Sequence, residues 1–330
     1  MKNRQDRKIL ILTTAVLVSL TLGGWQSVAA QGKAYPAKEV NICVGAPPGG
    51  TLDISGRVIA KVLTKMWGQQ AVIVNKPGGA QSVSGAYVAN ARPDGYTLAY
   101  ILNPYLIMKK LEEPGLPYTA EKFTWLGAFS KSNLILTVKA DSPWKTYEEF
   151  VDYGVKNPGK IVFGSDGAGG VQHLFQLQFG DKTGIRDFTH VPFAGGGPAV
   201  QALLGGHVNA VTIAAGPTAP YVKSGDLRYL AIFSPKRDPE YPDVPTIKEK
   251  GLPLYGGAWS VFAGPKGLPP AIAQRLVKDL KEASVHEEVK AMFKKIGWEY
   301  GYSTPEDCLK IWKEEEILYA KEMKKYGFIK

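Results

Sequence analysis

The sequence predicts an α/β protein of two lobes, each a largely parallel sheet flanked by helices. Apolar runs typical of strands alternate with amphipathic helical runs, a pattern that indicates parallel sheets covered by helices. The alternation occurs twice, first from residue 40 and again from about residue 133. Two such units in one chain favour a clamshell of the kind found in periplasmic binding proteins, which close on a ligand by hinge motion.

The first run starts with an apolar strand at 40–44, followed by a helical pattern that ends near Met66. Apolar residues recur there every four positions from Ile54, with Ile59 and Leu63 beside them, and Gly68 follows as a helix end. A strand at 71–74, a helix at 83–91 and a strand at 97–102 complete this run.

The second run predicts strands at 134–138, 161–164, 189–193, 208–214 and 227–233, with helices at 147–156, 171–182, 198–204 and 217–223. A proline-rich stretch, 235–253, and a strand at 259–263 follow. Two or three helices end the chain, and Thr304 with Pro305 gives the last one a cap and a first-turn proline. We expect the chain to cross between lobes near 129–133 and to return near 255–260. The first lobe is then 31–131 with 255–330, and the second is 132–254.

The first thirty residues have the parts of a secretory leader. Four basic residues lie within the first eight, an apolar run continues to about residue 22, and small residues occupy 27–30. The apolar run is shorter than the roughly 20 residues that a transmembrane helix needs. The first cysteine is Cys43, so a lipoprotein anchor is not supported. We expect cleavage after Ala30, with Ala29 as the alternative, and export to the periplasm.

The charge of the chain does not indicate nucleic-acid binding. The formal net charge is +10, and the leader holds four basic residues and one acidic residue. Its removal leaves 36 basic residues against 29 acidic ones, a net charge of +7. This excess favours anionic ligands modestly. The lysines of the last fifty residues alternate with glutamates as on solvated helix faces, and no nucleic-acid-binding motif occurs.

We expect the protein to be a monomer.

The two cysteines of this exported chain, Cys43 and Cys308, leave two alternatives open. They could form a disulfide, as cysteines in oxidising compartments do. They could instead be two small buried residues, which the sequence favours because one lies in an apolar strand and the other in a late helix.

Three glycine-rich loops, 45–51, 164–170 and 193–198, are expected between a strand and a helix. A helix N-terminus has unpaired N–H groups and a partial positive charge, and glycines let an anion approach them. Ligands of open α/β sheets lie outside the carboxyl ends of the strands. The residues expected to bind a ligand are Pro48, Gly49, Gly50, Thr51, Asp53, Asn103, Ser165, Gly167, Ala168, Gly169, His173, Phe193, Gly196 and Gly197.

Some of these residues have alternative roles. Asp53 complements the helix dipole and caps its loop, or it contacts an amine, a hydroxyl or a bridging water of the ligand. His173 fixes its own loop or bonds to the ligand, and the loop role is favoured. Asn103, Tyr105, Phe193 and Trp259 are candidates for ligand selectivity or for ordinary packing.

An exported hydrolase is the main alternative, and the sequence does not favour it. A nucleophile elbow needs G-x-S-x-G, but Phe163 stands two positions before Ser165. His173 follows Ser165 without an evident third triad member. Dinucleotide and phosphate-loop motifs are absent, and the four histidines lack metal-ligand spacing. We therefore expect no enzyme activity, no metal and no cofactor.

Several short segments, taken in order and spacing, carry a family resemblance. They are Pro48-Gly49-Gly50-Thr51-Leu52-Asp53, Asn75-Lys76-Pro77-Gly78-Gly79, Pro93-Asp94-Gly95-Tyr96-Thr97-Leu98, Gln172-His173-Leu174, Val191-Pro192-Phe193 and Pro242-Asp243-Val244-Pro245-Thr246. From about Tyr35 to its end, the chain resembles the receptors of tripartite tricarboxylate transporters, also called the Bug or TctC-like family. Two departures bear on the ligand. The family commonly has more glycine where Ala80-Gln81 stands, and aspartates where Asn209 and Ile213-Ala214 stand.

The resemblance implies a periplasmic solute-binding protein that holds a small carboxylate through backbone N–H groups and ordered water. Such a protein hands its ligand to a membrane permease driven by an ion gradient. A sensory role, in which the same cleft presents a ligand to a signalling system, stays open. The identity of the ligand stays open too.

Overall fold

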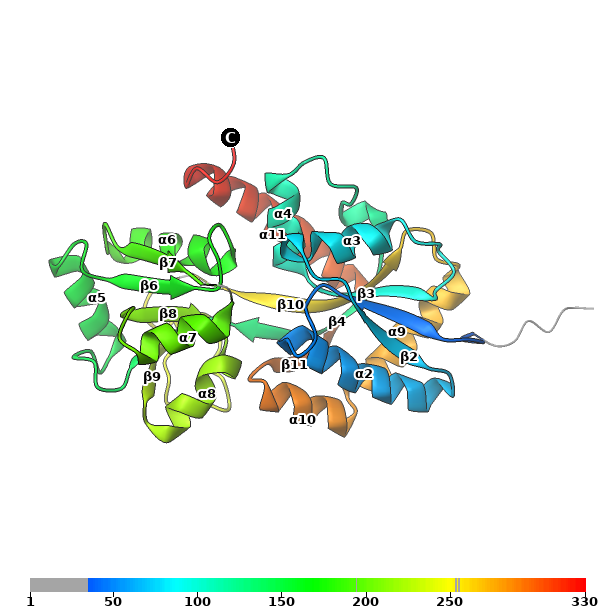
Figure 1. The fold of residues 1–330 in the computed structure, drawn as a ribbon, viewed down its shortest axis with the longest axis horizontal. Helices are drawn as coiled ribbons and strands as arrows, with labels where there is room; N and C mark the ends of the chain where they lie inside the picture. Colours follow the sequence, from blue (N-terminus) through cyan, green and yellow to red (C-terminus); the bar gives the residue numbers. More distant parts are fainter. Residues whose placement is uncertain (1–34, 194, 253, 255) are drawn as a thin grey trace, which may run out of the picture. The chain divides into compact units, whose positions relative to one another are not determined.

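A computed structural model describes residues 35–193, 195–252, 254 and 256–330. The predicted leader lies outside these residues. Residues 35–37 belong to a short N-terminal unit, and all described helices and strands lie in the compact unit Lys38–Lys330. That unit contains two sheets with helices packed against them (Figure 1), which confirms the predicted fold class.

In the described part of the chain, the first sheet has six strands in the order β11-β4-β10-β3-β1-β2. They are β1 (Val40–Val44), β2 (Ala71–Asn75), β3 (Thr97–Leu102), β4 (Phe123–Asn133), β10 (Gly257–Pro265) and β11 (Glu299–Ser303). Strand β1 pairs in parallel with β2 and β3, in a register that places Ile42 opposite Ile73 and Leu98. Strand β10 runs antiparallel to β3 and β4, and β11 antiparallel to β4.

The helices that accompany this sheet come from both ends of the main unit. They are α2 (Thr51–Trp67), η1 (Gly79–Gln81), α3 (Ser82–Ala89), α4 (Asn103–Glu112), η2 (Ala120–Lys122), α9 (Pro270–Ser284), α10 (Glu287–Lys295) and α11 (Pro305–Lys325). We call this group, β1 to β4 and β10 to α11, the first lobe.

The second sheet has five strands in the order β7-β6-β8-β5-β9. The strands are β5 (Ile135–Lys139), β6 (Val162–Ser165), β7 (Thr189–Pro192), β8 (Ala210–Ile213) and β9 (Leu227–Ile232). Its helices are α5 (Tyr147–Lys156), α6 (Val171–Thr183), α7 (Gly196–Leu204) and α8 (Ala215–Ser224). Strand β6 pairs in parallel with β7 and β8, while β5 runs antiparallel to β8 and β9. We call β5 to β9, with these helices, the second lobe.

Both sheets are mixed, which corrects the prediction of largely parallel sheets. The chain leaves the first sheet along β4, enters the second along β5, and returns to the first along β10. A strand that brings the chain back runs opposite to the strands that lead outward, so β10 is antiparallel to both of its neighbours. In the second sheet the entering strand, β5, is the antiparallel one for the same reason.

Local sequence signals explain where several helices begin and end. Gly68 ends α2 in the left-handed conformation, with φ of 63°. Thr304 caps α11, its hydroxyl accepting from the Asp307 N–H while the Asp307 carboxylate accepts in return, and Pro305 occupies the first turn. In α2, Ile59 and Leu63 are buried, but Ile54 is 44% exposed. The apolar face is therefore rotated from the predicted one.

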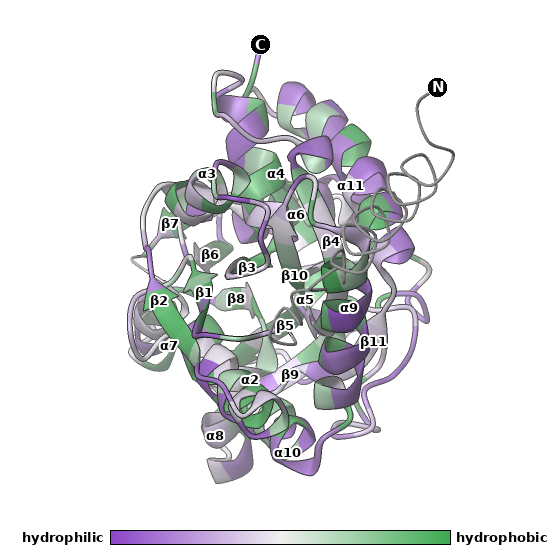
Figure 2. Cartoon of the chain, turned by 90° about the vertical axis from the view of Figure 1, so that its right-hand side faces the viewer, coloured by the Kyte–Doolittle hydropathy of each residue, from purple (hydrophilic) through white to green (hydrophobic). Residues whose placement is uncertain are grey.

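Apolar residues between the sheets and their helices form the cores. Hydrophilic residues lie mainly on the outer sides of helices such as α9 and α11 (Figure 2). Cys43 and Cys308 are both free thiols buried in the same first-lobe core cluster, which also contains Trp312. Burial raises the pKa of Cys43 to about 11 and that of Cys308 to about 12. Both thiols are therefore protonated and shielded from solvent.

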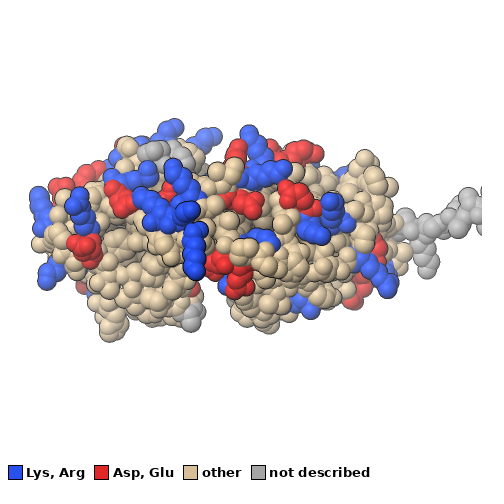
Figure 3. Space-filling model, turned by 90° about the horizontal axis from the view of Figure 1, so that it is seen from above, with Lys and Arg blue, Asp and Glu red and all other residues tan. Residues whose placement is uncertain are grey.

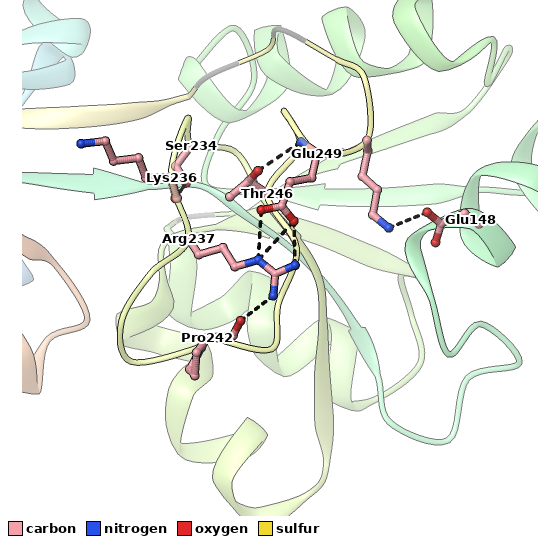
Figure 4. Close-up of polar contacts among 8 residues, drawn as sticks. Glu148, Ser234, Lys236, Arg237, Pro242, Thr246 and Glu249 are labelled. Carbon is pink, nitrogen blue, oxygen red and sulfur yellow. Dashed lines mark hydrogen bonds and ion pairs between the residues drawn. The ribbon is translucent and has the colours of Figure 1, made fainter.

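The proline-rich stretch after β9 is held by side-chain contacts rather than by regular structure (Figure 4). Arg237 forms a forked ion pair with Glu249, at 2.8–3.1 Å, and donates to the Pro242 carbonyl at 2.7 Å. The Thr246 hydroxyl accepts from the Glu249 N–H at 3.2 Å. These contacts fold the stretch back onto the second lobe, where Ile232 and Thr246 form a bridge.

Candidate ligand-binding site

Three helices have a glycine N-cap and follow a strand through a short loop. Gly50, Gly170 and Gly195 are the N-cap residues of α2, α6 and α7, and within the described residues none of these helix starts has a side-chain cap. The first N–H groups of a helix have no partner in the helix itself. Strands β3 and β6 both point toward the opposite lobe in Figure 1. Uncapped N–H groups therefore gather at the facing edges of the two sheets.

The loop before α2 is built on Asp53. Its side chain is almost fully buried, and Oδ2 accepts from the Gly49 N–H at 2.9 Å while Oδ1 accepts from Asn75 Nδ2 at 2.8 Å. Arg57 pairs with both oxygens. Burial disfavours the charge, but hydrogen bonds from Arg57, Gly49 and Asn75 outweigh it and lower the pKa of Asp53. The carboxylate thus caps the loop, the first of its predicted roles.

The η1 segment supports the same loop through Gln81. Gln81 Oε1 accepts from the Leu102 N–H at 3.0 Å, and its stem packs on Gly45 so closely that a Cβ there would lie 2.6 Å from Gln81 Cβ. Ala80 and Gln81 have left-handed backbones, with φ of 47° and 70°. Non-glycine residues rarely adopt this conformation, and such strain concentrates at binding sites. Gln81 therefore links the loop after β1 to the end of β3.

The loop before α6 is closed by Ser165. Its side chain is fully buried, and Oγ donates to the Gly167 carbonyl at 2.9 Å and accepts from the Gly167 N–H at 3.2 Å. His190 Nε2, on β7, lies 2.7 Å from the same oxygen. The Asp166 N–H donates to Gln172 Oε1 at 3.0 Å. The Ser165 hydroxyl is thus used by its own loop rather than presented to solvent.

His173 fixes the end of that loop that leads into α6. Its Nδ1 accepts from the Gly169 N–H at 3.1 Å, and its ring stacks on His190 with centroids 3.6 Å apart. Phe328, from the chain end, packs on His173 at 5.1 Å. Burial lowers the pKa of His173, and burial together with His173 lowers that of His190 to about 4. Both rings are therefore neutral at pH 7.

The two lobes meet beside this loop. Tyr105, on α4, donates its hydroxyl to Asp166 Oδ2 at 2.9 Å, and burial raises the pKa of Asp166. A cavity of about 210 Å³ adjoins the contact and is lined by Gly79 and Ala80 from the first lobe and Gly169 from the second. On the opposite side, the first turn of α8 packs on the turn after α10, where a Cβ at Gly216 would lie 2.4 Å from the Ile296 carbonyl oxygen.

The candidate selectivity residues are mostly used in packing. Asn103 is 2% exposed, and its Oδ1 accepts from the Trp259 N–H at 3.0 Å while its Nδ2 donates to Glu315. Phe193 packs against the second-lobe core beneath Gly164. By contrast, Gly49 and Gly197 are exposed, and a Cβ at either would have no other heavy atom within 4 Å.

The structure separates the predicted residues other than Asn103 and Phe193 into two groups. Those on exposed loop backbone are Pro48, Gly49, Ala168 and Gly197, and Gly50, Thr51, Gly167, Gly169 and Gly196 lie partly exposed beside them. Those whose side chains fix the loops are Asp53, Ser165 and His173. The sequence analysis missed His190 and Gln81 as loop supports. The sequence of β7, Thr189-His190-Val191-Pro192, has no apolar-polar alternation that would single out His190.

Among the described residues, no carboxylate bonds to His190, and no group of three or more His, Cys, Asp or Glu could hold a metal. No helix in the described ranges is long and apolar enough to cross a membrane. Basic and acidic side chains are interspersed on the face seen from above (Figure 3). The arrangement is suited to binding through backbone donors.

Comparison with known proteins decides the family. Residues 55–326 match the tripartite tricarboxylate transporter family receptor, TctC. The chain belongs to this family. A UPF0065 protein in the gbd 5' region of Cupriavidus necator is 34% identical over 289 residues, which cover 84% of this chain and 85% of the relative. Protein BugT of Bordetella pertussis is 30% identical over 275 residues, 82% of this chain and 84% of BugT.

Solved structures agree with this assignment. A TctC solute-binding protein from Polaromonas, without ligand, has a TM-score of 0.77 and 30% identity, and the match covers 88% of this chain and 99% of that one. Rpa4515 of R. palustris, solved with adipate, has a TM-score of 0.77 at 27% identity, covering 89% and 98%. MatC of Rhodopseudomonas palustris, with bound malate, has a TM-score of 0.74 at 27% identity, covering 87% and 99%. This TctC receptor is therefore a solute-binding protein, and its family is not an enzyme family.

Proposed function

We propose that this receptor works in the periplasm, captures a small organic carboxylate between its lobes by hinge closure, and delivers it to a tripartite tricarboxylate-type permease. The predicted leader, cleaved after Ala30, would supply export. The adipate and malate of the solved relatives support a dicarboxylate as the ligand class. In this proposal the protein carries out no reaction on its ligand.

One observation carries the proposal: the uncapped glycine starts of α2, α6 and α7. Two belong to the second lobe and one to the first, so a molecule with two carboxylates can be held from both sides. A hydrogen bond that involves a charged group contributes about 1.5–3 kcal/mol, more than a neutral one. In the proposed complex, Gly49, Gly50, Gly196 and Gly197 let the carboxylates approach the helix starts, while Asp53, Ser165 and His173 keep the loops in shape.

Binding is tested first by thermal shift and calorimetry of the purified mature protein with adipate, malate and a tricarboxylate. A ligand at 100 times its dissociation constant adds about 2.7 kcal/mol to the free energy of unfolding. Gly50→Val then tests the first-lobe loop, because Gly50 has φ of −69° and accepts a side chain without left-handed strain. Gly197→Val tests the second-lobe loop in the same way.

We expect each valine variant to stay folded by circular dichroism and to bind the carboxylate at least about tenfold more weakly, the equivalent of losing 1.4 kcal/mol. Gly301→Val, on exposed β11, is the matched control and should bind as the wild type does. Unchanged affinity in both loop variants would contradict the proposed site. A screen in which no carboxylate binds would contradict the proposed ligand class.

A further inference from the structure

Glu315 is a partly buried carboxyl group where the two lobes meet. It lines a cavity of about 130 Å³ with Tyr319 of the same helix, α11, and with Lys131 of β4. The opposite wall is α6 of the second lobe, including Phe175 and Gln178. The cavity adjoins both crossings of the chain, because β4 ends at Asn133 and β10 starts at Gly257. Its enclosure therefore depends on how the second lobe lies against the first.

The partner of this carboxyl group is a neutral amide. Asn103 Nδ2 donates to Glu315 Oε2, and Asn103 Oδ1 accepts from the Trp259 N–H at 3.0 Å. Lys131 lines the same cavity, but its ammonium lies 5.3 Å from the centroid of the Trp259 ring, and no ion pair with Glu315 forms among the described residues. Partial burial destabilises a carboxylate that has no paired cation, and protonation removes that cost.

The charged and titratable groups around Glu315 shift its pKa in both directions. Burial raises its pKa to about 8, against the attraction of Lys131 and the hydrogen bond from Asn103, with Glu314 adding to the rise. Burial also lowers the pKa of Lys131, which Glu299 of β11 opposes. Tyr319 faces the same cavity, with Tyr105 of α4 beyond it, and burial keeps both phenols protonated. The lining residues of α6 and β10 are not titratable.

We propose that Glu315 is a proton-binding site that couples pH to the closing of the two lobes, so that a carboxylate ligand is captured together with a proton. This inference rests on the proposed hinge closure. When the lobes separate, water reaches the cavity and Glu315 ionises as an ordinary carboxyl group. When α6 covers the cavity, Glu315 takes up a proton. The closed form therefore binds the proton more tightly, and lower pH favours closure.

Solution X-ray scattering of the ligand-free mature protein tests the coupling without knowledge of the ligand. We expect the radius of gyration of the wild type to increase as pH rises from about 4.3, the pKa of an open and solvated Glu315, to about 8, its pKa in the closed form, because only in this range does the closed form bind the extra proton. Glu315→Gln keeps the shape of the side chain but cannot ionise, so its radius should equal the wild-type value at low pH throughout. Glu314→Gln, on the exposed side of α11, is the matched control: it should keep the wild-type response, shifted slightly to lower pH because Glu314 adds to the rise of the Glu315 pKa.

Calorimetry with adipate and malate gives the second measurement. Wild-type affinity should fall by up to about tenfold per pH unit in the same range, with proton uptake seen as a buffer-dependent heat, and Glu315→Gln should show neither effect. A radius of gyration that does not change with pH in the wild type, or one that still changes in Glu315→Gln, would overturn the inference. If neither dicarboxylate binds, the proposed ligand class fails, and the scattering result still decides the role of Glu315.

Discussion

At the scale of single residues, the site is built from side chains that hold backbone in place. Asp53 accepts hydrogen bonds from Gly49, Asn75 and Arg57, and it is almost fully buried. In Asp53→Asn one oxygen becomes an amide that faces other donors. We expect the free energy of unfolding to fall by about 1–3 kcal/mol, the cost of leaving buried partners unsatisfied. Urea denaturation at neutral pH measures this loss.

Asp152→Asn is the matched control for that change, since Asp152 is exposed on α5 and its pair with Lys156 is only at 4.0 Å. Exposed pairs contribute about 0–1 kcal/mol. Equal effects of the two substitutions would mean that Asp53 is an ordinary surface carboxylate in solution.

The stacked histidines predict sensitivity to acid. The pKa of His190 is about 4 in the fold, because of burial and of His173, against about 6.5 in an unfolded chain. The unfolded chain therefore binds the proton more readily. The stability from neutral His190 is complete above pH 6.5 and is lost as pH falls toward 4. In His190→Gln we expect a lower urea midpoint at neutral pH, because the Ser165 contact changes, and a smaller further drop in acid.

His207→Gln provides the comparison, since His207 is exposed on the turn after α7. Its acid-dependent loss of stability should match that of the wild type. If His190→Gln loses stability in acid as steeply as the wild type, another group controls the effect.

At the scale of elements, the two chain crossings constrain the fold most strongly. Gly257 starts β10, and a Cβ at this position would lie 1.8 Å from the Ser132 carbonyl oxygen on β4. Gly257→Ala therefore cannot be accommodated without moving one strand. We expect a loss of about 1–3 kcal/mol or more in the free energy of unfolding, as for overpacked sites. Gly301→Ala, on exposed β11, has open space at the Cβ and should change the urea midpoint little.

The sequence predicted the elements whose signals are local. Strand β1, the end of α2 at Gly68 and the capped start of α11 all follow from neighbouring residues. The sequence did not predict α4, which starts with Asn103-Pro104 directly after β3 without a side-chain cap, or β11, whose alternation is weak and whose first residues are exposed. The rotation of α2 likewise depends on Gly56, which packs on Ile73 and Tyr100, residues distant in sequence.

The same reasoning applies to the site. Its glycine loops could be predicted because strand, loop and helix are consecutive. The supports provided by His190, Gln81 and Tyr105 could not, because each acts on a segment more than 20 residues away, through pairing or packing that only the fold defines. The same is true of Ser165, whose hydroxyl faces its own loop and His190, a residue 25 positions away.

At the scale of the whole molecule, export determines where the mature chain starts. We expect the mature protein to start at or near Gln31, because small residues at 27–30 follow the apolar run of the leader. N-terminal sequencing of the protein from the periplasm of a Gram-negative host measures this. A chain that keeps Met1 and stays with the membrane fraction would contradict the prediction.

The contact of Tyr105 with Asp166 links the two lobes next to the ligand loop, so it should matter for binding more than for folding. In Tyr105→Phe the partly buried Asp166 loses a hydrogen bond at 2.9 Å, but only when the lobes are closed. Leaving a buried acceptor unpaired costs about 1–3 kcal/mol, so we expect carboxylate affinity to fall about 5- to 150-fold. Each lobe should unfold as in the wild type, because in an open molecule water replaces the phenol.

Calorimetry with adipate and malate measures the loss of affinity, and Tyr300→Phe, 48% exposed on β11, is the control. Full affinity in Tyr105→Phe would show that the bound state does not use this contact, and closure would then have to occur around a different set of interlobe partners.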